Sequence, residues 1–177
     1  NDIGVGLDGS PAGGGSAAQR VVDEIKAAGG DAVANGSNVA DWAQAEQLIQ
    51  TAVEHFGGVD VLVNNAGIVR DRMFANTSEE EFDAVIAVHL KGHFNIYRHA
   101  SAVMRKQPNG GSIIGFTSGA HIGSVAQANY SAAKGGIVSL TRSAAIGLHR
   151  YGVRANCIAP IARTRMSENV PFEIETG

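Results

Sequence analysis

The sequence predicts an α/β protein whose doubly wound parallel sheet carries helices on both faces. Segments in which apolar residues recur at helical spacing alternate with short apolar runs, and short turns connect them. The run 59–63 is almost continuously apolar, which is typical of a strand covered on both faces. It then breaks into a polar turn that ends in glycine. Strands in the interior with helices around them account best for this pattern.

Length and composition fit one domain, which we assign to residues 1–177. The chain has 177 residues, of which 44% are hydrophobic, and this suffices for one core but not for two ordinary domains. The formal net charge is −3 and the basic residues are scattered, which argues against nucleic acid or a membrane surface as partner. The single cysteine, Cys157, and the lack of a signal or membrane-spanning run predict a soluble, cytoplasmic protein.

The first part of the chain predicts two helices and a strand between them. Ser16 is a candidate N-cap for a helix that stops at Gly29–Gly30. Residues 31–39 follow as a short strand. Asp41 can then cap a second helix, which Gly57–Gly58 end.

The alternation continues to the end of the chain. Ser78 and Glu81 match a capping box that begins one long helix over 79–106. The elements expected after it are a strand over 112–118, a helix over 129–149, a strand over 153–160 that Pro160 must end, and a final strand over 172–177.

Two features near the start of the chain are relevant to nucleotide binding. Gly4, Gly6 and Gly9 spell G-x-G-x-x-G, but no buried strand precedes them and no helix follows at once, so we interpret this stretch as a loop. Asp2 is more informative, because a carboxylate at the end of an early strand can accept hydrogen bonds from a ribose and repels a 2′-phosphate. A plain turn aspartate is the equal alternative.

Tyr130 and Lys134 are the candidate chemical pair. They are four residues apart on a predicted helix, so both side chains lie on one face. An ammonium group near a phenol favours the phenolate, which would move the phenol pKa towards neutrality. Small residues around the pair leave room for a flat ligand. Alone, this spacing is more often a solvated helix face.

Two neighbouring strands end in residues suited to the same site. Ser118 ends the strand over 112–118, and its hydroxyl can hold a substrate oxygen. The turn Asn64–Gly67 ends another strand, where glycine permits a close approach of backbone to ligand. Because strand ends of a parallel sheet share one edge, we expect these residues to line one cleft.

The order NNAG, strand-end serine and Tyr-x-x-x-Lys resembles the short-chain dehydrogenase/reductase family from Asp2 to about Met166. The resemblance implies a Rossmann-like sheet and a nicotinamide cofactor. It implies that Tyr130 is the catalytic acid/base, that Lys134 lowers its pKa and holds the nicotinamide ribose, and that Ser118 positions the reacting oxygen. The cofactor-binding residues that it implies are Asp2, Asn38, Val39, Asn65, Ala66, Gly67, Tyr130, Lys134, Pro160, Ile161 and Thr164.

Asp2 favours NAD over NADP as the cofactor. No metal is expected, because the histidines show no metal-ligand spacing with carboxylates or with Cys157. A homodimer or homotetramer is expected from apolar residues on two helices. These residues are Ala84, Val85, Val88, Phe94, Ile96 and Ala100 on one helix and Ile137, Leu140, Ala144, Ala145 and Leu148 on the other.

Within the family, the stretches GIVRDRMF, VHLKGHF and AQANYSAAK resemble the (3R)-hydroxyacyl-CoA dehydrogenase part of peroxisomal multifunctional enzymes and its bacterial relatives. The resemblance implies oxidation of a 3-hydroxyacyl thioester, with acyl-CoA as the expected substrate. A 3-oxoacyl-[acyl carrier protein] reductase and a non-catalytic dinucleotide-binding scaffold are the alternatives. Four arginines border the expected cleft and either meet a phosphate-bearing substrate or are merely solvated: Arg70, Arg72, Arg163 and Arg165.

Three departures from the family pattern stand out. The first strand with its phosphate-binding turn, and the substrate lid before 172–177, are both lacking, so we interpret the sequence as incomplete. Ser118 lies one residue nearer Tyr130 than the serine of the family pattern, and Thr117 occupies the position of that serine. Either hydroxyl could hold the substrate oxygen. His89 stands at a helix position where many family members have an asparagine. It is either a catalytic relay that binds a bridging water or a residue without a catalytic role, and the two alternatives are equal.

Overall fold

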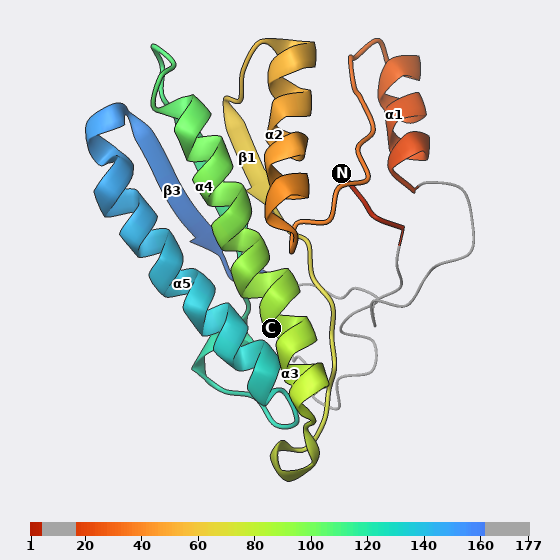
Figure 1. The fold of residues 1–177 in the computed structure, drawn as a ribbon, viewed down its shortest axis with the longest axis vertical. Helices are drawn as coiled ribbons and strands as arrows, with labels where there is room; N and C mark the ends of the chain where they lie inside the picture. The colour runs from red at the N-terminus through yellow and green to blue at the C-terminus, as the bar shows by residue number, and fades with distance from the viewer. Residues whose placement is uncertain (5–16, 162–177) are drawn as a thin grey trace, which may run out of the picture.

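The computed structural model describes residues 1–4 and 17–161, and within them a three-stranded parallel sheet is the central layer (Figure 1). Its strands are β1 (Val61–Asn64), β2 (Gly111–Phe116) and β3 (Val153–Ile158), in the order β1-β2-β3. Each strand runs parallel to its neighbour, with Val61 opposite Ser112 and Gly111 opposite Val153. The predicted parallel α/β class is confirmed.

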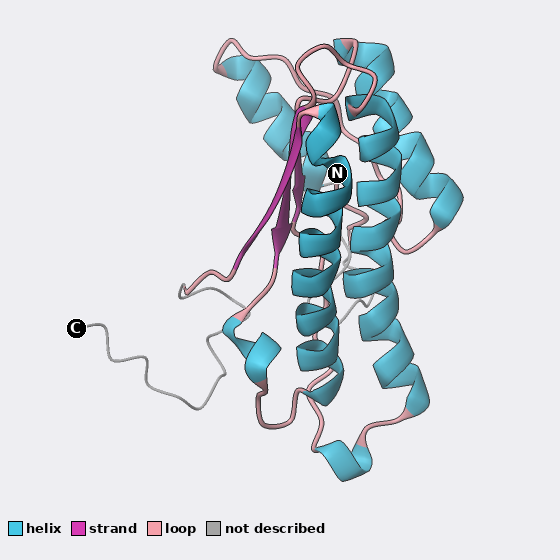
Figure 2. Ribbon diagram, turned by 90° about the vertical axis from the view of Figure 1, so that its left-hand side faces the viewer, coloured by secondary structure: helices cyan, strands magenta, loops and turns pink. Residues whose placement is uncertain are grey.

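Helices flank this sheet. α2 (Trp42–Phe56), α4 (Gly92–Met104) and α5 (Ala128–Leu148) form a layer beside it, whereas α1 (Ala17–Ala27) stands apart at the N-terminal side (Figure 1). Figure 2 shows α5 running alongside the strands on one side of the sheet plane. Val61 and Val63 of β1 remain 59% and 56% exposed, so the prediction that this strand is covered on both faces is wrong for the described residues.

The core lies between the sheet and the layer of α2, α4 and α5. Its members are apolar side chains that alternate with exposed ones at helical or strand spacing. The buried cluster consists of Val39, Ala45, Ile49, Val59, Ile96, Tyr97, Ala100, Met104, Ile113, Val153 and Ala155. Burial of this cluster holds the strand ends in a fixed position relative to α5.

The helix ends follow the predicted capping chemistry. The Asp41 side chain accepts a hydrogen bond from the Gln44 backbone N–H at 2.8 Å, and Gly57 ends α2 with φ of 82°. Ser78 and Glu81 form a complete capping box at the start of α3 (Glu79–Ile86). These local predictions are confirmed.

The single long helix predicted over 79–106 differs from the structure. It consists of α3, a π-helical turn (Ala87–Lys91) and α4. A π turn adds a residue to the helical repeat and rotates the side chains that follow it. His89 lies within this turn and is almost completely buried. The apolar spacing on either side of the turn still looks helical, which is why the sequence does not reveal it.

The predicted strand over 31–39 is wrong, because the structure has no strand there. Asp2 N–H donates to the Asn35 carbonyl at 3.1 Å, and the Asn1 side chain donates to the Ser37 carbonyl at 3.0 Å. One backbone hydrogen bond does not make a ladder, so residues 31–39 do not pair as a strand with the described residues 1–4. Several predicted features lie outside the described residues: Gly6, Gly9, Ser16, Arg163, Thr164, Arg165 and the strand over 172–177.

Candidate active site

The carboxyl end of β2 is joined to α5 by two reciprocal hydrogen bonds. The Lys134 ammonium Nζ donates to the Phe116 carbonyl at 2.7 Å. The Thr117 hydroxyl donates to the Lys134 carbonyl at 2.9 Å. These bonds bring the first turns of α5 to the sheet edge where strand ends and ligands meet in parallel α/β folds.

Tyr130 and Lys134 lie on one face of α5, as predicted. The Lys134 Nζ is 5.3 Å from the centroid of the Tyr130 ring. The pKa of the Tyr130 phenol nevertheless lies above its ordinary value, because burial disfavours the phenolate. The neighbouring Ser118 hydroxyl lowers this pKa and the Asp71 carboxylate raises it. In the protein alone, burial therefore outweighs the lowering of the phenol pKa expected from the nearby ammonium.

Lys134 is itself deeply buried, with 4% of its surface exposed. Burial lowers the pKa of its ammonium group to about 8, since the charged form loses solvation. Within the described residues its Nζ has one hydrogen-bond acceptor, the Phe116 carbonyl. An ammonium group has three N–H donors, so two remain for a ligand.

Ser118 and Thr117 have different surroundings, although the sequence left both open. Thr117 is buried and its hydroxyl is used by the Lys134 carbonyl. Ser118 is half-buried, accepts a hydrogen bond from the Ala120 N–H at 3.2 Å and lies beside the Tyr130 phenol. Of the two hydroxyls, that of Ser118 is the one that contributes to the pKa of Tyr130.

His89 packs into the same cluster from the π-helical turn. Its Nε2 lies 2.7 Å from the Ile68 carbonyl and 3.1 Å from the Ile68 N–H, while its Nδ1 has no partner among the described residues. A Cβ on Gly67 would overlap the His89 ring, which explains the glycine there. Burial, with the charges of Lys134 and His93, lowers the His89 pKa to about 3, so the ring is neutral.

His93 is a buried residue at this site that the sequence analysis missed. Its Nδ1 lies 2.6 Å from the His89 carbonyl, and burial lowers its pKa to about 4. A second histidine four residues after His89 in a helix rich in apolar residues was the signal available in the sequence.

The residues predicted to bind the cofactor fall into two groups. Ala66 and Gly67 follow β1 beside His89, with Asn65 exposed, and Pro160 and Ile161 are exposed after β3.

The second group lies towards the N-terminal side. The Asp2 carboxylate accepts from the Gly4 N–H at 2.6 Å, and the Asn38 side chain accepts from the Ala40 N–H at 2.9 Å. Val39 is buried, and its carbonyl accepts from the Asn95 side chain at 2.9 Å. No contact within the described residues joins this group to Tyr130 or Lys134. Thr164, as noted, lies outside them.

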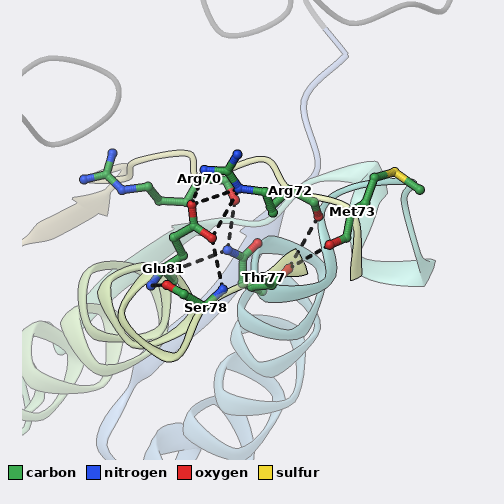
Figure 3. A network of polar contacts seen from close by, with 7 residues as sticks. Arg70, Arg72, Met73, Thr77, Ser78 and Glu81 are labelled. Carbon is green, nitrogen blue, oxygen red and sulfur yellow. Dashed lines mark hydrogen bonds and ion pairs between the residues drawn. The ribbon is translucent and has the colours of Figure 1, made fainter. Parts of the chain in front are cut away.

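Two of the arginines expected at the cleft lie on the loop after β1. The Arg72 guanidinium forms an ion pair with the Glu81 carboxylate at 2.6 Å, and Glu81 also accepts from the Ser78 N–H (Figure 3). Arg72 thereby lowers the pKa of Glu81. In Figure 3 the Arg70 side chain points away from Arg72. Arg72 is thus engaged with the protein, whereas Arg70 forms no ion pair within the described residues.

Neither a metal site nor a membrane-spanning helix is found among residues 1–4 and 17–161. No group of three or more histidine, cysteine, aspartate or glutamate side chains is arranged to hold a metal ion there. No helix in the same residues combines the length and apolar character needed to cross a membrane.

A family model described as short chain dehydrogenase matches residues 12–173. The chain belongs to the short-chain dehydrogenase family. A short chain dehydrogenase from Mycobacterium avium, known from its crystal structure, shares 70% identity and superposes with a TM-score of 0.84, covering 92% of this chain and 60% of that one. The family resemblance of the sequence motifs is thereby confirmed.

Two curated relatives align with almost the whole of this chain. The chain is 48% identical to the hydroxyacyl-CoA dehydrogenase ChsB1 of Mycobacterium tuberculosis, over 96% of this chain and 54% of that protein. It is 44% identical to the peroxisomal multifunctional enzyme type 2 of Mus musculus, over 96% of this chain and 23% of that protein. The chain thus spans about half of the first relative and less of the second.

Proposed function

We propose that this chain forms the core of an NAD-dependent dehydrogenase that interconverts a 3-hydroxyacyl thioester and its 3-oxoacyl form. One observation carries the proposal: the Ser118 hydroxyl, the Tyr130 phenol and the Lys134 ammonium come together at the carboxyl edge of the sheet. The names of the relatives, a hydroxyacyl-CoA dehydrogenase and a peroxisomal multifunctional enzyme, support the substrate class.

The three side chains divide the chemistry of alcohol oxidation. Tyr130 removes the hydroxyl proton of the substrate as general base, and returns it in the reverse direction. The Ser118 hydroxyl holds the reacting oxygen beside the phenol. Lys134 brings positive charge close to the phenol, which favours the phenolate at the moment of proton transfer. Because the raised Tyr130 pKa disfavours the phenolate in the protein alone, bound ligands must shift this balance.

The residues present fit a nicotinamide cofactor. Two N–H donors of the buried Lys134 ammonium are free of protein partners in the described residues and suit ribose hydroxyls. The exposed Asn65, the close-packed Gly67 and the exposed Pro160 border the same edge. A nicotinamide held there would supply the acceptor for the hydride of the carbinol carbon. NAD is proposed over NADP because the Asp2 carboxylate would repel a 2′-phosphate.

The test uses the full-length protein with NAD and (3R)-3-hydroxybutyryl-CoA, and follows NADH by its absorbance. We expect turnover, and we expect Tyr130→Phe to lower kcat by about 100-fold or more while NAD still binds. Tyr151→Phe, at a tyrosine near the end of α5, is the matched control and should keep its activity. Cofactor binding without turnover on any secondary alcohol would favour the scaffold alternative.

The thioester carrier is tested by the salt dependence of catalysis. Coenzyme A brings phosphate groups that a rim arginine such as Arg70 can bind, and such binding weakens as salt screens charge. We expect kcat/KM for the CoA thioester to fall with salt, and that for a short pantetheine thioester to change little. A preference for acyl carrier protein over both would identify the reductase alternative.

We also propose a homodimer or homotetramer and a cytoplasmic location. Of the apolar residues expected at the subunit interface, Val85, Ile96, Ala100 and Ile137 are buried in the monomer, so they are not available to a partner. Phe94 of α4 remains 48% exposed, beside Trp42 of α2, which is 44% exposed. Light scattering of the full-length protein at micromolar concentration tests the assembly, and a monomer mass would contradict it.

A further inference from the structure

We propose that Asn129 is a positioning residue for the reaction, because its side chain ties the first turn of α5 to the loop 70–72. Through this tie it sets where the Tyr130 phenol lies relative to that loop. The inference rests on the proposed role of Tyr130 as the acid/base.

The Asn129 side chain joins three segments that are far apart in the sequence. Its Nδ2 donates to the Arg70 carbonyl at 3.0 Å and to the Glu81 carbonyl at 3.4 Å. Its Oδ1 accepts from the Tyr130 backbone N–H at 2.7 Å. The residue is only 1% exposed. A buried amide with all of these partners is geometrically fixed, since losing any bond leaves a buried polar group unpaired.

The bond to the Tyr130 N–H replaces a conventional helix cap. Gln127 occupies the N-cap position of α5, and its side chain makes no capping hydrogen bond. The first backbone N–H groups of a helix have no partner within the helix. Asn129 therefore satisfies one of them at Tyr130 itself, and the same side chain holds the neighbouring loop.

Other bonds join the same two segments, but at the surface. The Arg72 N–H donates to the Ala126 carbonyl at 2.8 Å, and the Gln127 side chain donates to the Asp71 carboxylate at 3.1 Å. The ion pair from Arg72 to Glu81 continues this network to α3 (Figure 3). Asn129 is the buried centre of these contacts, whereas Asp71 and Arg72 are exposed.

The position of the loop matters to Tyr130 because the loop carries Asp71. The Asp71 carboxylate raises the pKa of the phenol, in addition to the larger effect of burial. Releasing the loop would expose Tyr130 to water and let this carboxylate move away. Both changes favour the phenolate and alter the alignment of the phenol with a substrate oxygen.

The experiment compares full-length wild type with Asn129→Ala and Asn129→Asp. Asn129→Asp keeps the shape and the acceptor for the Tyr130 N–H but removes both donors. We expect both variants to lose about 10- to 100-fold in kcat, with KM for NAD within about twofold, because a displacement near 1 Å suffices for such a loss. Thr141→Val is the control. It removes a buried hydrogen bond from the same helix to Tyr97 and should lower stability but not kcat.

A second readout does not depend on turnover. With ¹³Cζ-labelled tyrosine, the NMR signal of Tyr130 is assigned by its loss in Tyr130→Phe, and its titration midpoint should fall in Asn129→Ala, which adds no charge of its own. Wild-type kcat in both variants together with an unchanged Tyr130 titration in Asn129→Ala would overturn the inference. If wild type has no dehydrogenase activity, the proposed function fails, and the titration still decides whether Asn129 positions Tyr130.

Discussion

The imidazole ring of His89 meets the ring of Tyr130 edge to face, with centroids 5.2 Å apart and an angle of 88° between the planes. The contact is made by a neutral ring, because burial holds the His89 pKa near 3. A positive charge at His89 would therefore arise inside the cluster that also contains Lys134. Protonation of His89 therefore destabilises the folded protein.

The low pKa values of the buried histidines predict that the protein loses stability in mild acid. The pKa values of His89 and His93 in the folded protein, about 3 and about 4, lie below the ordinary 6.5, so the unfolded chain binds more protons between these limits. Stability is complete above pH 6.5 and falls as the pH drops towards 4, by about 1.4 kcal/mol per unit for each ring. Chemical denaturation at several pH values measures this slope.

His89→Asn should remove one ring's share of the slope, and the exposed His149→Gln should leave the slope unchanged. An equal slope in wild type and His89→Asn would contradict the assignment of acid sensitivity to this ring.

Replacing Lys134 by methionine should stabilise the protein at pH 7 while abolishing activity. The folded pKa of about 8 lies below the ordinary 10.5, so the penalty for burying the charge is full below pH 8 and disappears as the pH rises through 10.5. The penalty is about 3 kcal/mol, and the Phe116 carbonyl loses its donor, which leaves a net gain of about 1 kcal/mol. Thermal melts at pH 7 and pH 10.5 check the prediction, and a gain that persisted at pH 10.5 would speak against this cause.

We expect the hydroxyl of Ser118 to act in catalysis and that of Thr117 to stabilise the fold. Ser118→Ala should lower kcat by about 100-fold or more, because it removes a donor from the reacting oxygen, and should cost about 0.5 kcal/mol of stability through the lost bond to the Ala120 N–H. Thr117→Val should cost about 1 kcal/mol of stability, because the Lys134 carbonyl loses a buried donor. Steady-state kinetics and urea denaturation of both variants distinguish the roles, and the reverse pattern would assign the substrate oxygen to Thr117.

Cofactor preference should depend on the charge of Asp2. The full-length protein should bind NADH at least about tenfold more tightly than NADPH, since a 2′-phosphate near the carboxylate is repelled. Asp2→Asn keeps an acceptor for the Gly4 N–H and should narrow the difference. Dissociation constants from fluorescence titration at low salt provide the measure. Equal affinities in the wild-type protein would refute the assignment.

Sequence reasoning succeeded where the signal is local. Asp41 and the Ser78–Glu81 box cap their helices through bonds to residues three positions away, so a short window of sequence contains the whole interaction. The Tyr130–Lys134 pair follows from helical spacing in the same way.

Features that depend on tertiary contacts were beyond the sequence. The π-helical turn at Ala87–Lys91 accompanies the packing of His89 against Ile68, which lies on another element. The choice between Thr117 and Ser118 depends on which hydroxyl the Lys134 carbonyl takes. The phenol pKa was predicted from one neighbour, whereas burial by the whole site has the larger effect.

The reciprocal bonds between β2 and α5 have a mechanical consequence. The ammonium group and the carbonyl of Lys134 form hydrogen bonds with two consecutive residues, Phe116 and Thr117. A displacement of α5 along β2 would therefore break both bonds together. The junction between β2 and α5 is therefore stiff. The loop after β1 is tied to the same helix through the buried Asn129 side chain, so we expect β2, α5 and this loop to respond to a bound molecule as one unit.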